Sequence, residues 1–120
     1  MQFKWTSILA GAALATGLST AMAQAPANTV RFALCYDLSK SYTFVTPQIA
    51  QAAKDYADIL NAKGGLEGKQ IEILTEDEQG DATQAVNCFT KMVDEGITAL
   101  VGDVTTTPTL AVAAESADYN

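Results

Sequence analysis

A short strand-like run followed by a helical segment occurs three times along this chain, and that alternation limits the fold more than any other feature. The strand-like runs are Val30 to Tyr36, Gln70 to Thr75 and Ile97 to Val101. Strands that alternate with helices form parallel sheets, because each helix carries the chain back to the same end of the sheet. We therefore expect an α/β fold: a three-layer open parallel sheet with helices on both faces.

The first helical segment has clear end signals. Thr46 is predicted to be its N-cap and Pro47 its first residue, and Gly64 is predicted to end it in a left-handed conformation. Its apolar residues recur at helical spacing, which predicts a stripe buried in the core. The stripe consists of Ile49, Ala53, Tyr56, Ala57 and Leu60.

The third strand-like run leads into a turn rich in hydroxyl groups. Gly102 breaks the run, Thr105, Thr106 and Thr107 follow, and Thr107 and Pro108 are predicted to be the N-cap and first residue of the next helix. Ligands of open α/β sheets bind at the carboxyl ends of strands, where helix N–H groups favour an anion or a polar head group. The alternative, a loop whose threonines satisfy only their own backbone, stays open at this point.

The loop after the first strand, residues 37–45, combines polar and aromatic residues in the sequence DLSKSYTFV. It lies at the same carboxyl edge as the threonine turn. Tyr42 and Phe44 could stack on a ligand or could form a lid on the core. We favour a position near the ligand, because loops at this edge carry function more often than other loops.

Three acidic residues, Glu76, Asp77 and Glu78, follow the second strand. Such a group could hold a metal ion or form a catalytic pair of carboxylates. No His and no further acid at a defined ligand spacing accompanies it, so we interpret it as a solvated loop and expect no metal and no cofactor. Asp81 and Gln84 then form a capping box that predicts the start of the second helix.

The first 23 residues are typical of a secretory signal peptide. Lys4 supplies the positive charge, Ile8 to Leu18 the short apolar segment, and Ala21-Met22-Ala23 the cleavage pattern. The apolar segment is too short to span a bilayer, so we expect cleavage after Ala23, export and no stable membrane insertion. Residues 24–29 are predicted to be a linker, and residues 30–120 the folded part, which has the character of a fragment.

Cys35 and Cys88 are the two cysteines, and an exported chain meets an oxidising compartment. If the strand order is 2-1-3, right-handed connections carry the second helix across the first strand and place Cys88 over Cys35. A Cys35–Cys88 disulfide is therefore one prediction. Two buried free thiols are the alternative, because a free cysteine packs well as a small apolar residue.

Charge and composition exclude several classes of function. The chain has 14 acidic and 7 basic residues, no His, and a net charge of −7. Without a cluster of Lys and Arg it does not fit a protein that binds nucleic acid or an anionic membrane surface. An Asp-His-Ser triad is impossible without His, and no G-x-S-x-G elbow is present, so we do not expect an enzyme.

Two segments carry a resemblance to a known family. NAKGGLEGKQIEIL, and DATQAVNCFTKMVDEGITALVGDVTTTPTLAVA after the acidic stretch, resemble the branched-chain amino-acid type of periplasmic substrate-binding protein. Members are the receptors of ABC importers and have a type I periplasmic-binding-protein fold with two lobes. The resemblance implies that residues 30–120 are the incomplete first part of the N-terminal lobe, and that the protein is periplasmic and delivers its ligand to a membrane permease.

The resemblance also implies ligand-binding residues. Thr105 and Thr106, and more loosely Thr107, correspond to the turn that holds the ligand's carboxylate or polar group, and Tyr42 and Phe44 lie in a loop that borders the cleft. The loop DLSKSYTF, Asp103 and Thr106 depart from the family pattern. These departures favour an amide, urea or aromatic acid over leucine, isoleucine or valine.

The leading prediction is thus a solute receptor for an amino acid or a related small carboxylate or amide. The alternative is a ligand-sensing domain of the same fold in a signalling receptor.

Overall fold

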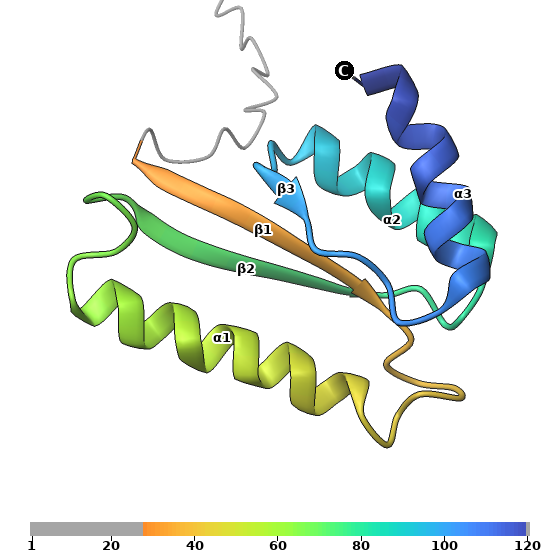
Figure 1. The fold of residues 1–120 in the computed structure, drawn as a ribbon, viewed down its shortest axis with the longest axis horizontal. Coiled ribbons are helices and arrows are strands. Elements are labelled where there is room, and N and C mark those ends of the chain that lie inside the picture. Colours follow the sequence, from red (N-terminus) through yellow and green to blue (C-terminus); the bar gives the residue numbers. More distant parts are fainter. Residues whose placement is uncertain (1–27, 120) are drawn as a thin grey trace, which may run out of the picture.

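The computed structural model describes residues 28–119, in which a small sheet lies between helices (Figure 1). The strands are β1 (Thr29–Tyr36), β2 (Gln70–Asp77) and β3 (Ala99–Leu100). The helices are α1 (Thr46–Ala62), α2 (Ala82–Asp94) and α3 (Thr106–Ser116), and a 3₁₀ turn (Ala117–Tyr119) follows α3. The predicted signal peptide, residues 1–23, and most of the predicted linker, residues 24–29, lie outside the described residues.

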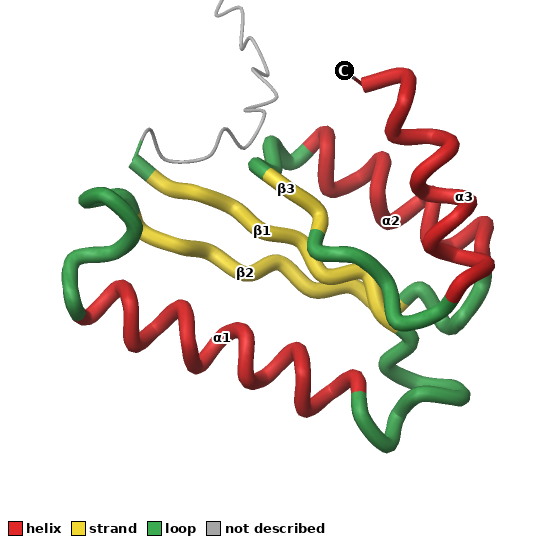
Figure 2. The backbone as a smooth tube through the Cα atoms, viewed as in Figure 1, coloured by secondary structure: helices red, strands yellow, loops and turns green. Residues whose placement is uncertain are grey.

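The three strands are parallel and lie in the order β2-β1-β3, which confirms the predicted order 2-1-3. β1 is the central strand, and it pairs with β2 from Thr29 opposite Gln70 to Tyr36 opposite Asp77. α1 covers one face of the sheet, and α2 and α3 cover the other (Figure 2). All three strands therefore end at one edge, from which the chain enters each helix.

Side chains of β1 alternate between two cores, because successive residues of a strand point to opposite faces. Ala33 and Cys35 pack against α2, whereas Leu34 and Tyr36 pack against α1. A strand buried on both faces needs apolar or small residues at successive positions. The sequence from Phe32 to Tyr36 meets this need.

A disulfide joins the central strand to the helix above it. Cys35 of β1 and Cys88 of α2 are bonded, with their Cα atoms 6.1 Å apart, and both residues are buried. That separation lies within the range that disulfides allow. Of the two possibilities that the sequence left open, the structure has the bridge.

α1 begins one residue earlier than predicted. Its N-cap is Val45, and Thr46 is its first residue and is fully buried. The Thr46 hydroxyl donates to the carbonyl oxygens of Asp37 and Tyr42, the latter at 3.0 Å, instead of capping the helix. The prediction of Thr46 as N-cap is therefore wrong: its hydroxyl ties the helix to the preceding loop.

The apolar stripe of α1 is only partly buried. Ala50 and Ala57 are buried against the sheet, but Tyr56 is 63% and Ile49 39% exposed. Small residues let the helix lie close to the sheet, so the larger side chains on its flank extend outward. The prediction that the whole stripe is core is wrong for these two residues.

β3 is shorter than the predicted run from Ile97 to Val101. Hydrogen bonds to β1 continue beyond its bounds, from the Thr98 N–H to the Arg31 carbonyl at 2.8 Å and from the Val101 N–H to the Ala33 carbonyl at 2.9 Å. Within the described residues β3 is an edge strand, bonded on one side only.

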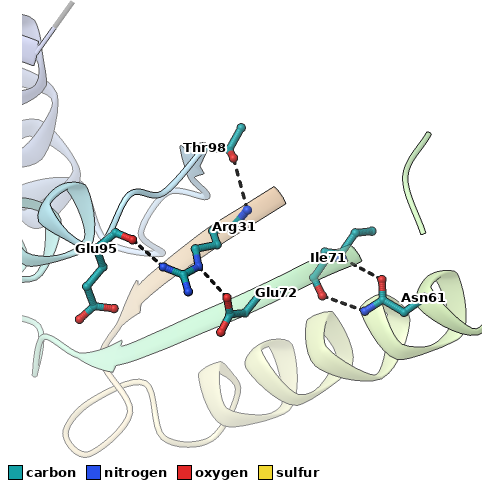
Figure 3. A network of polar contacts seen from close by, with 6 residues as sticks. All are labelled: Arg31, Asn61, Ile71, Glu72, Glu95 and Thr98. Carbon is teal, nitrogen blue, oxygen red and sulfur yellow. Dashed lines mark hydrogen bonds and ion pairs between the residues drawn. The ribbon is translucent and has the colours of Figure 1, made fainter. Parts of the chain in front are cut away.

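A polar network fixes the outer strand and the central strand (Figure 3). The side-chain amide of Asn61 donates to the Ile71 carbonyl at 2.8 Å and its oxygen accepts the Ile71 N–H at 2.7 Å. Asn61 thereby supplies the two hydrogen bonds that a neighbouring strand would make to the backbone of β2 at this edge. Arg31 donates to Glu72 at 2.6 Å and to the Glu95 carbonyl at 2.7 Å, which joins β1 to β2 and to the end of α2.

Candidate functional site

Two connections leave the carboxyl edge of the sheet toward opposite faces (Figure 1). Residues 37–45 lead from β1 to α1 on one face, and residues 101–105 lead from β3 to α3 on the other. β1 and β3 are neighbours, so this is the point where the direction of the connections reverses. In open α/β sheets a ligand crevice forms at such a point. We therefore take these two connections as the candidate site.

Helix α3 begins earlier in the threonine-rich turn than predicted. Thr105 is the N-cap and Thr106 the first residue, so Thr107 and Pro108 lie inside the first turn. The reason is Asp103, whose Oδ1 accepts the Thr105 N–H at 2.9 Å and the Thr105 hydroxyl at 3.2 Å. This carboxylate shapes the turn, and the prediction of Thr107 as N-cap is wrong.

Thr106 and Thr107 present open hydrogen-bond donors. Both residues are exposed, and within residues 28–119 neither their N–H groups nor their hydroxyls have a partner. Four donors therefore lie together at the positive end of the α3 dipole, where oxygen atoms of a ligand bind favourably. Thr105 differs, because Asp103 engages its amide and its hydroxyl.

A hollow of about 280 Å³ lies beside this helix start. Its lining comes from the turn and from the first turn of α3: Asp103, Val104, Thr105, Thr106, Thr109 and Leu110. Thr106 is thus both an open donor and part of a concave surface.

Tyr42 and Phe44 lie together in the loop after β1. Their rings stack with centroids 6.0 Å apart, and Phe44 is 75% exposed whereas Tyr42 is half-buried. Such exposure does not fit Phe44 as a lid on the core of the described residues. The pair forms an aromatic surface in the connection that borders the candidate crevice.

Asp37 organises that loop, and our sequence analysis missed it. It is fully buried, and its carboxylate accepts the N–H groups of Ser39, Lys40, Ser41 and Tyr42 at 3.3, 2.7, 2.7 and 3.1 Å. Burial alone would raise the pKa of Asp37, but these four N–H groups outweigh it and hold the pKa below its ordinary value. An Asp followed by small polar residues is a turn signal that could have identified it.

The acidic stretch is not a solvated loop. Glu76 and Asp77 belong to β2, and Glu78 is fully buried. Glu76 forms an ion pair with Lys91 of α2. The sequence interpretation is wrong because the strand is two residues longer than its apolar pattern indicates and because Glu78, which follows the strand, is buried.

The environments of Asp77 and Glu78 shift their pKa values in opposite directions. Burial raises the pKa of Asp77, but hydrogen bonds from Ser39 and from the N–H groups of Leu38 and Gln79 lower it below its ordinary value. Burial, together with the nearby carboxylates, raises the pKa of Glu78 to about 7. Two adjacent carboxyl groups therefore differ in charge near neutral pH.

Within residues 28–119, no group of three or more His, Cys, Asp or Glu side chains is placed to hold a metal ion. In the same part of the chain, none of the helices has the length and apolar character needed to cross a membrane.

Comparisons with known proteins agree on one family. The family model described as periplasmic binding protein matches residues 29–119. The chain is 34% identical over 58 residues to the Leu/Ile/Val-binding protein BraC3 of Rhizobium johnstonii, covering 48% of this chain and 16% of that protein. It is 30% identical over 59 residues to Leu/Ile/Val-binding protein homolog 3 of Brucella melitensis, covering 49% and 16%.

Solved structures show the same fold. The branched-chain amino acid transporter substrate-binding protein LivJ of Streptococcus pneumoniae, in complex with isoleucine, matches with a TM-score of 0.65 and 30% identity, covering 75% of this chain and 26% of LivJ. The chain thus spans about a quarter of that structure and only 16% of the two curated relatives. With a family match over most of its length and a shared fold, the chain belongs to the periplasmic binding protein family.

Proposed function

We propose that this chain is the first part of the N-terminal lobe of a periplasmic solute receptor of an ABC importer. Its ligand is an amino acid or a related small carboxylate or amide, held between two lobes. In such a receptor a second lobe completes the site, and this chain spans only about a quarter of the solved LivJ structure. Ligand contacts from both lobes stabilise the closed state, and the membrane permease recognises that state.

The observation that carries this proposal is the start of α3. The exposed N–H groups and hydroxyls of Thr106 and Thr107 have no partner within the described residues, and Thr106 lines a hollow at the carboxyl edge of the sheet. Polar groups that stay unpaired in a concave site are those that a ligand can satisfy. A carboxylate or an amide oxygen suits four donors at a helix N-terminus.

The charges around the edge support a ligand that also carries a nitrogen group. Asp37 and Asp103 both lie at this edge, and Asp103 lines the same hollow as Thr106. An amino acid or an amide offers an oxygen acceptor to the donors at the start of α3. It also offers N–H groups to the side of the site where the carboxylates lie. A ligand with two negative charges would be repelled by these carboxylates.

The proposal also covers the export of the protein and its partner in the membrane. The signal peptide is removed after Ala23, the mature protein acts in the periplasm, and its partner is an ABC transporter permease. No enzymatic activity is proposed. Mass spectrometry of the mature protein should show Gln24 as the first residue.

Calorimetric titration of the full-length protein with amino acids, amides and aromatic acids tests the ligand class. Thr106→Val and Thr107→Val remove one hydroxyl each without reducing side-chain volume. Each should weaken binding about 10-fold, because a lost hydrogen bond costs on the order of 1 kcal/mol or more when its partner stays buried. Thr83→Val is the matched control, since Thr83 is the second residue of α2 as Thr107 is of α3.

Full affinity in both α3 variants would contradict the assigned contact. Absence of binding to every compound in the three classes would contradict the proposed ligand class.

A further inference from the structure

Glu78 is an acidic residue in a fully buried position. Among the described residues its side chain is the largest that is fully buried, and neither Oε1 nor Oε2 has a hydrogen-bond partner there. The two ion pairs in residues 28–119 are Lys91 with Glu76 and Arg31 with Glu72. Neither ion pair includes Glu78. A buried carboxylate without a partner is strongly unfavourable, so these observations indicate a carboxyl group that is neutral in the folded protein.

The backbone of Glu78 is held on both sides. Its N–H donates to the Tyr36 carbonyl at 3.0 Å, which extends the pairing of β1 and β2 by one residue. Its carbonyl accepts the N–H of Asp81, the N-cap of α2, at 3.0 Å. Exposing the carboxyl group to water therefore requires a movement of the turn of residues 78–81 or of the segments packed on it.

That turn is strained. Gln79 has a φ angle of 59° and Gly80 has one of 70°, so both residues lie in the left-handed region. This conformation is unfavourable for Gln, which has a Cβ atom, and it persists where surrounding contacts hold it. A buried charge that weakens those contacts therefore favours opening of the turn.

The loop between β1 and α1 is joined to this turn. Oδ1 of Asp77 accepts the N–H of Leu38 in the loop at 2.9 Å and the N–H of Gln79 in the turn at 3.0 Å. A Cβ atom at Gly80 would lie 3.4 Å from Oδ2 of Asp37, so the turn and the loop also lie against each other. A movement of one segment therefore disturbs the other.

We propose that Glu78 is a pH-sensitive switch: as a neutral acid it lets the turn of residues 78–81 pack against the loop that carries Tyr42 and Phe44, and as a carboxylate it releases both segments. On deprotonation the O–H bond of the acid breaks and the proton goes to solvent water, and no other bond changes. The inference goes beyond the proposed function, because it concerns two connections of this chain and requires no solute.

The electrostatic surroundings of Glu78 support this role. Burial is the largest cause of its raised pKa, and the Asp103 and Asp37 carboxylates raise it further. The N–H groups of Gly80 and Asp81 lower the pKa but do not outweigh these effects. The charged side chains that act on Glu78 are thus both carboxylates, and a further negative charge beside them is unfavourable.

The sign of the pH effect follows from the direction of the shift. The pKa of Glu78 in the folded protein, about 7, lies above its ordinary value of 4.5. The stabilisation is therefore complete below the ordinary value and is lost as pH rises through about 7. The turn and the loop are held together on the acid side of neutrality and loosened on the alkaline side.

Carbon-13 NMR of the full-length protein with labelled Glu carboxyl carbons tests the titration. One signal should titrate near pH 7 and should be absent in Glu78→Gln, whereas Glu67→Gln, at an exposed position, should keep it. Sequential assignment of Glu78 in the unsubstituted protein gives the same reading without any substitution. A Glu78 carboxyl group that titrates below pH 5.5 would overturn the proposal, and so would a neutral titration that persists in Glu78→Gln.

Amide hydrogen exchange tests whether the switch moves the two segments. At pH 8 the amides of Leu38 and Gln79 should exchange roughly 10-fold faster in the unsubstituted protein than in Glu78→Gln, because an amide side chain mimics the neutral acid. At pH 5 the two proteins should exchange alike. The amide of Ile71, near the opposite edge of the sheet, should not differ at either pH. Equal exchange of Leu38 and Gln79 at pH 8 would overturn the coupling.

Thermal unfolding between pH 5 and 8.5 gives a second readout. The midpoint of the unsubstituted protein should fall relative to that of Glu78→Gln as pH rises toward neutrality. A constant difference between the two midpoints would contradict the switch. All three measurements are made without a solute, so their failure leaves the proposed function untouched, and a failure to bind solutes leaves the switch untouched.

Discussion

At the scale of the residue, Asp37 holds the loop between β1 and α1 in place. One carboxylate accepts four consecutive N–H groups, from Ser39 to Tyr42, and so fixes the backbone that carries the Tyr42 and Phe44 rings. Hydrogen bonds to a charged acceptor are the stronger kind. The loop is therefore ordered by a residue that need not contact a ligand.

Asp37→Asn should loosen this loop, because the amide turns one of the acceptor atoms into a donor that faces N–H groups. We expect a lower unfolding midpoint and faster amide hydrogen exchange at residues 39–42 of the full-length protein. Asp58→Asn, at an exposed position on α1, is the matched control. Unchanged exchange at these four amides would contradict the role of Asp37.

The same residue predicts a pH effect on the acid side. The pKa of Asp37 in the folded protein lies below its ordinary value of 3.8. Its stabilisation is thus present above that value and is lost as pH falls through the lowered pKa. This dependence is opposite in direction to that of Glu78.

Single residues were the hardest level to predict from the sequence. The hydroxyl turn was located correctly because Thr, Thr, Thr and Pro carry local signals. Asp37 was missed although its hydrogen bonds are local, and Glu78 was placed in a solvated loop because its burial depends on segments distant in sequence. Asp103 was noticed only as a departure from a pattern, and its hydrogen bonds to Thr105 shift the helix start by two residues.

At the scale of the element, the segment NAKGG joins α1 to β2. Asn61 binds both backbone groups of Ile71, and Gly64 and Gly65 reverse the chain with φ angles of 107° and 78°. Only Gly65 is also sterically confined. A Cβ atom there would lie 2.0 Å from the Lys69 carbonyl oxygen, whereas one at Gly64 would meet nothing within 4 Å.

Gly65→Ala should therefore destabilise the full-length protein far more than Gly64→Ala. Both substitutions introduce a side chain at positive φ, which costs roughly 1–2 kcal/mol. Gly65→Ala adds a backbone clash, so we expect a total loss of about 3 kcal/mol or more in denaturant unfolding. Equal losses in the two variants would show that the clash is relieved without cost.

Elements were predicted well where periodicity is strong and poorly at their ends. α2 begins at the predicted Asp81, whose carboxylate accepts the N–H groups of Thr83 and Gln84. The starts of α1 and α3 differ because the Thr46 hydroxyl binds the preceding loop and because Asp103 binds Thr105, and both contacts override the predicted caps. The β3 run was predicted too long, since only Ala99 and Leu100 pair regularly with β1, although hydrogen bonds from Thr98 and Val101 continue on either side.

At the scale of the whole molecule, the disulfide joins the central strand to α2 across 53 positions of sequence. In the loop-entropy model, closing a loop of this size stabilises the native state by about 4 kcal/mol. Replacing both cysteines by Ala in the full-length protein should lower the free energy of unfolding by roughly that amount. The control is to count free thiols in the unsubstituted protein after unfolding it without a reductant. Two reactive thiols would contradict the bridge.

The strand order was predictable at this scale because the alternation of strand and helix, together with right-handed connections, leaves few arrangements. The ligand was not, because the chain spans only about a quarter of the solved LivJ structure, so it holds at most a part of the contacts that the proposed receptor would make.

A crystal structure of the full-length protein with its solute bound is the most direct test of the site at the carboxyl edge. We expect an oxygen atom of the solute within hydrogen-bond distance of the N–H or hydroxyl groups of Thr106 and Thr107, with the loop of Tyr42 and Phe44 beside it. A solute bound away from the start of α3, with these donors facing water, would contradict the assignment.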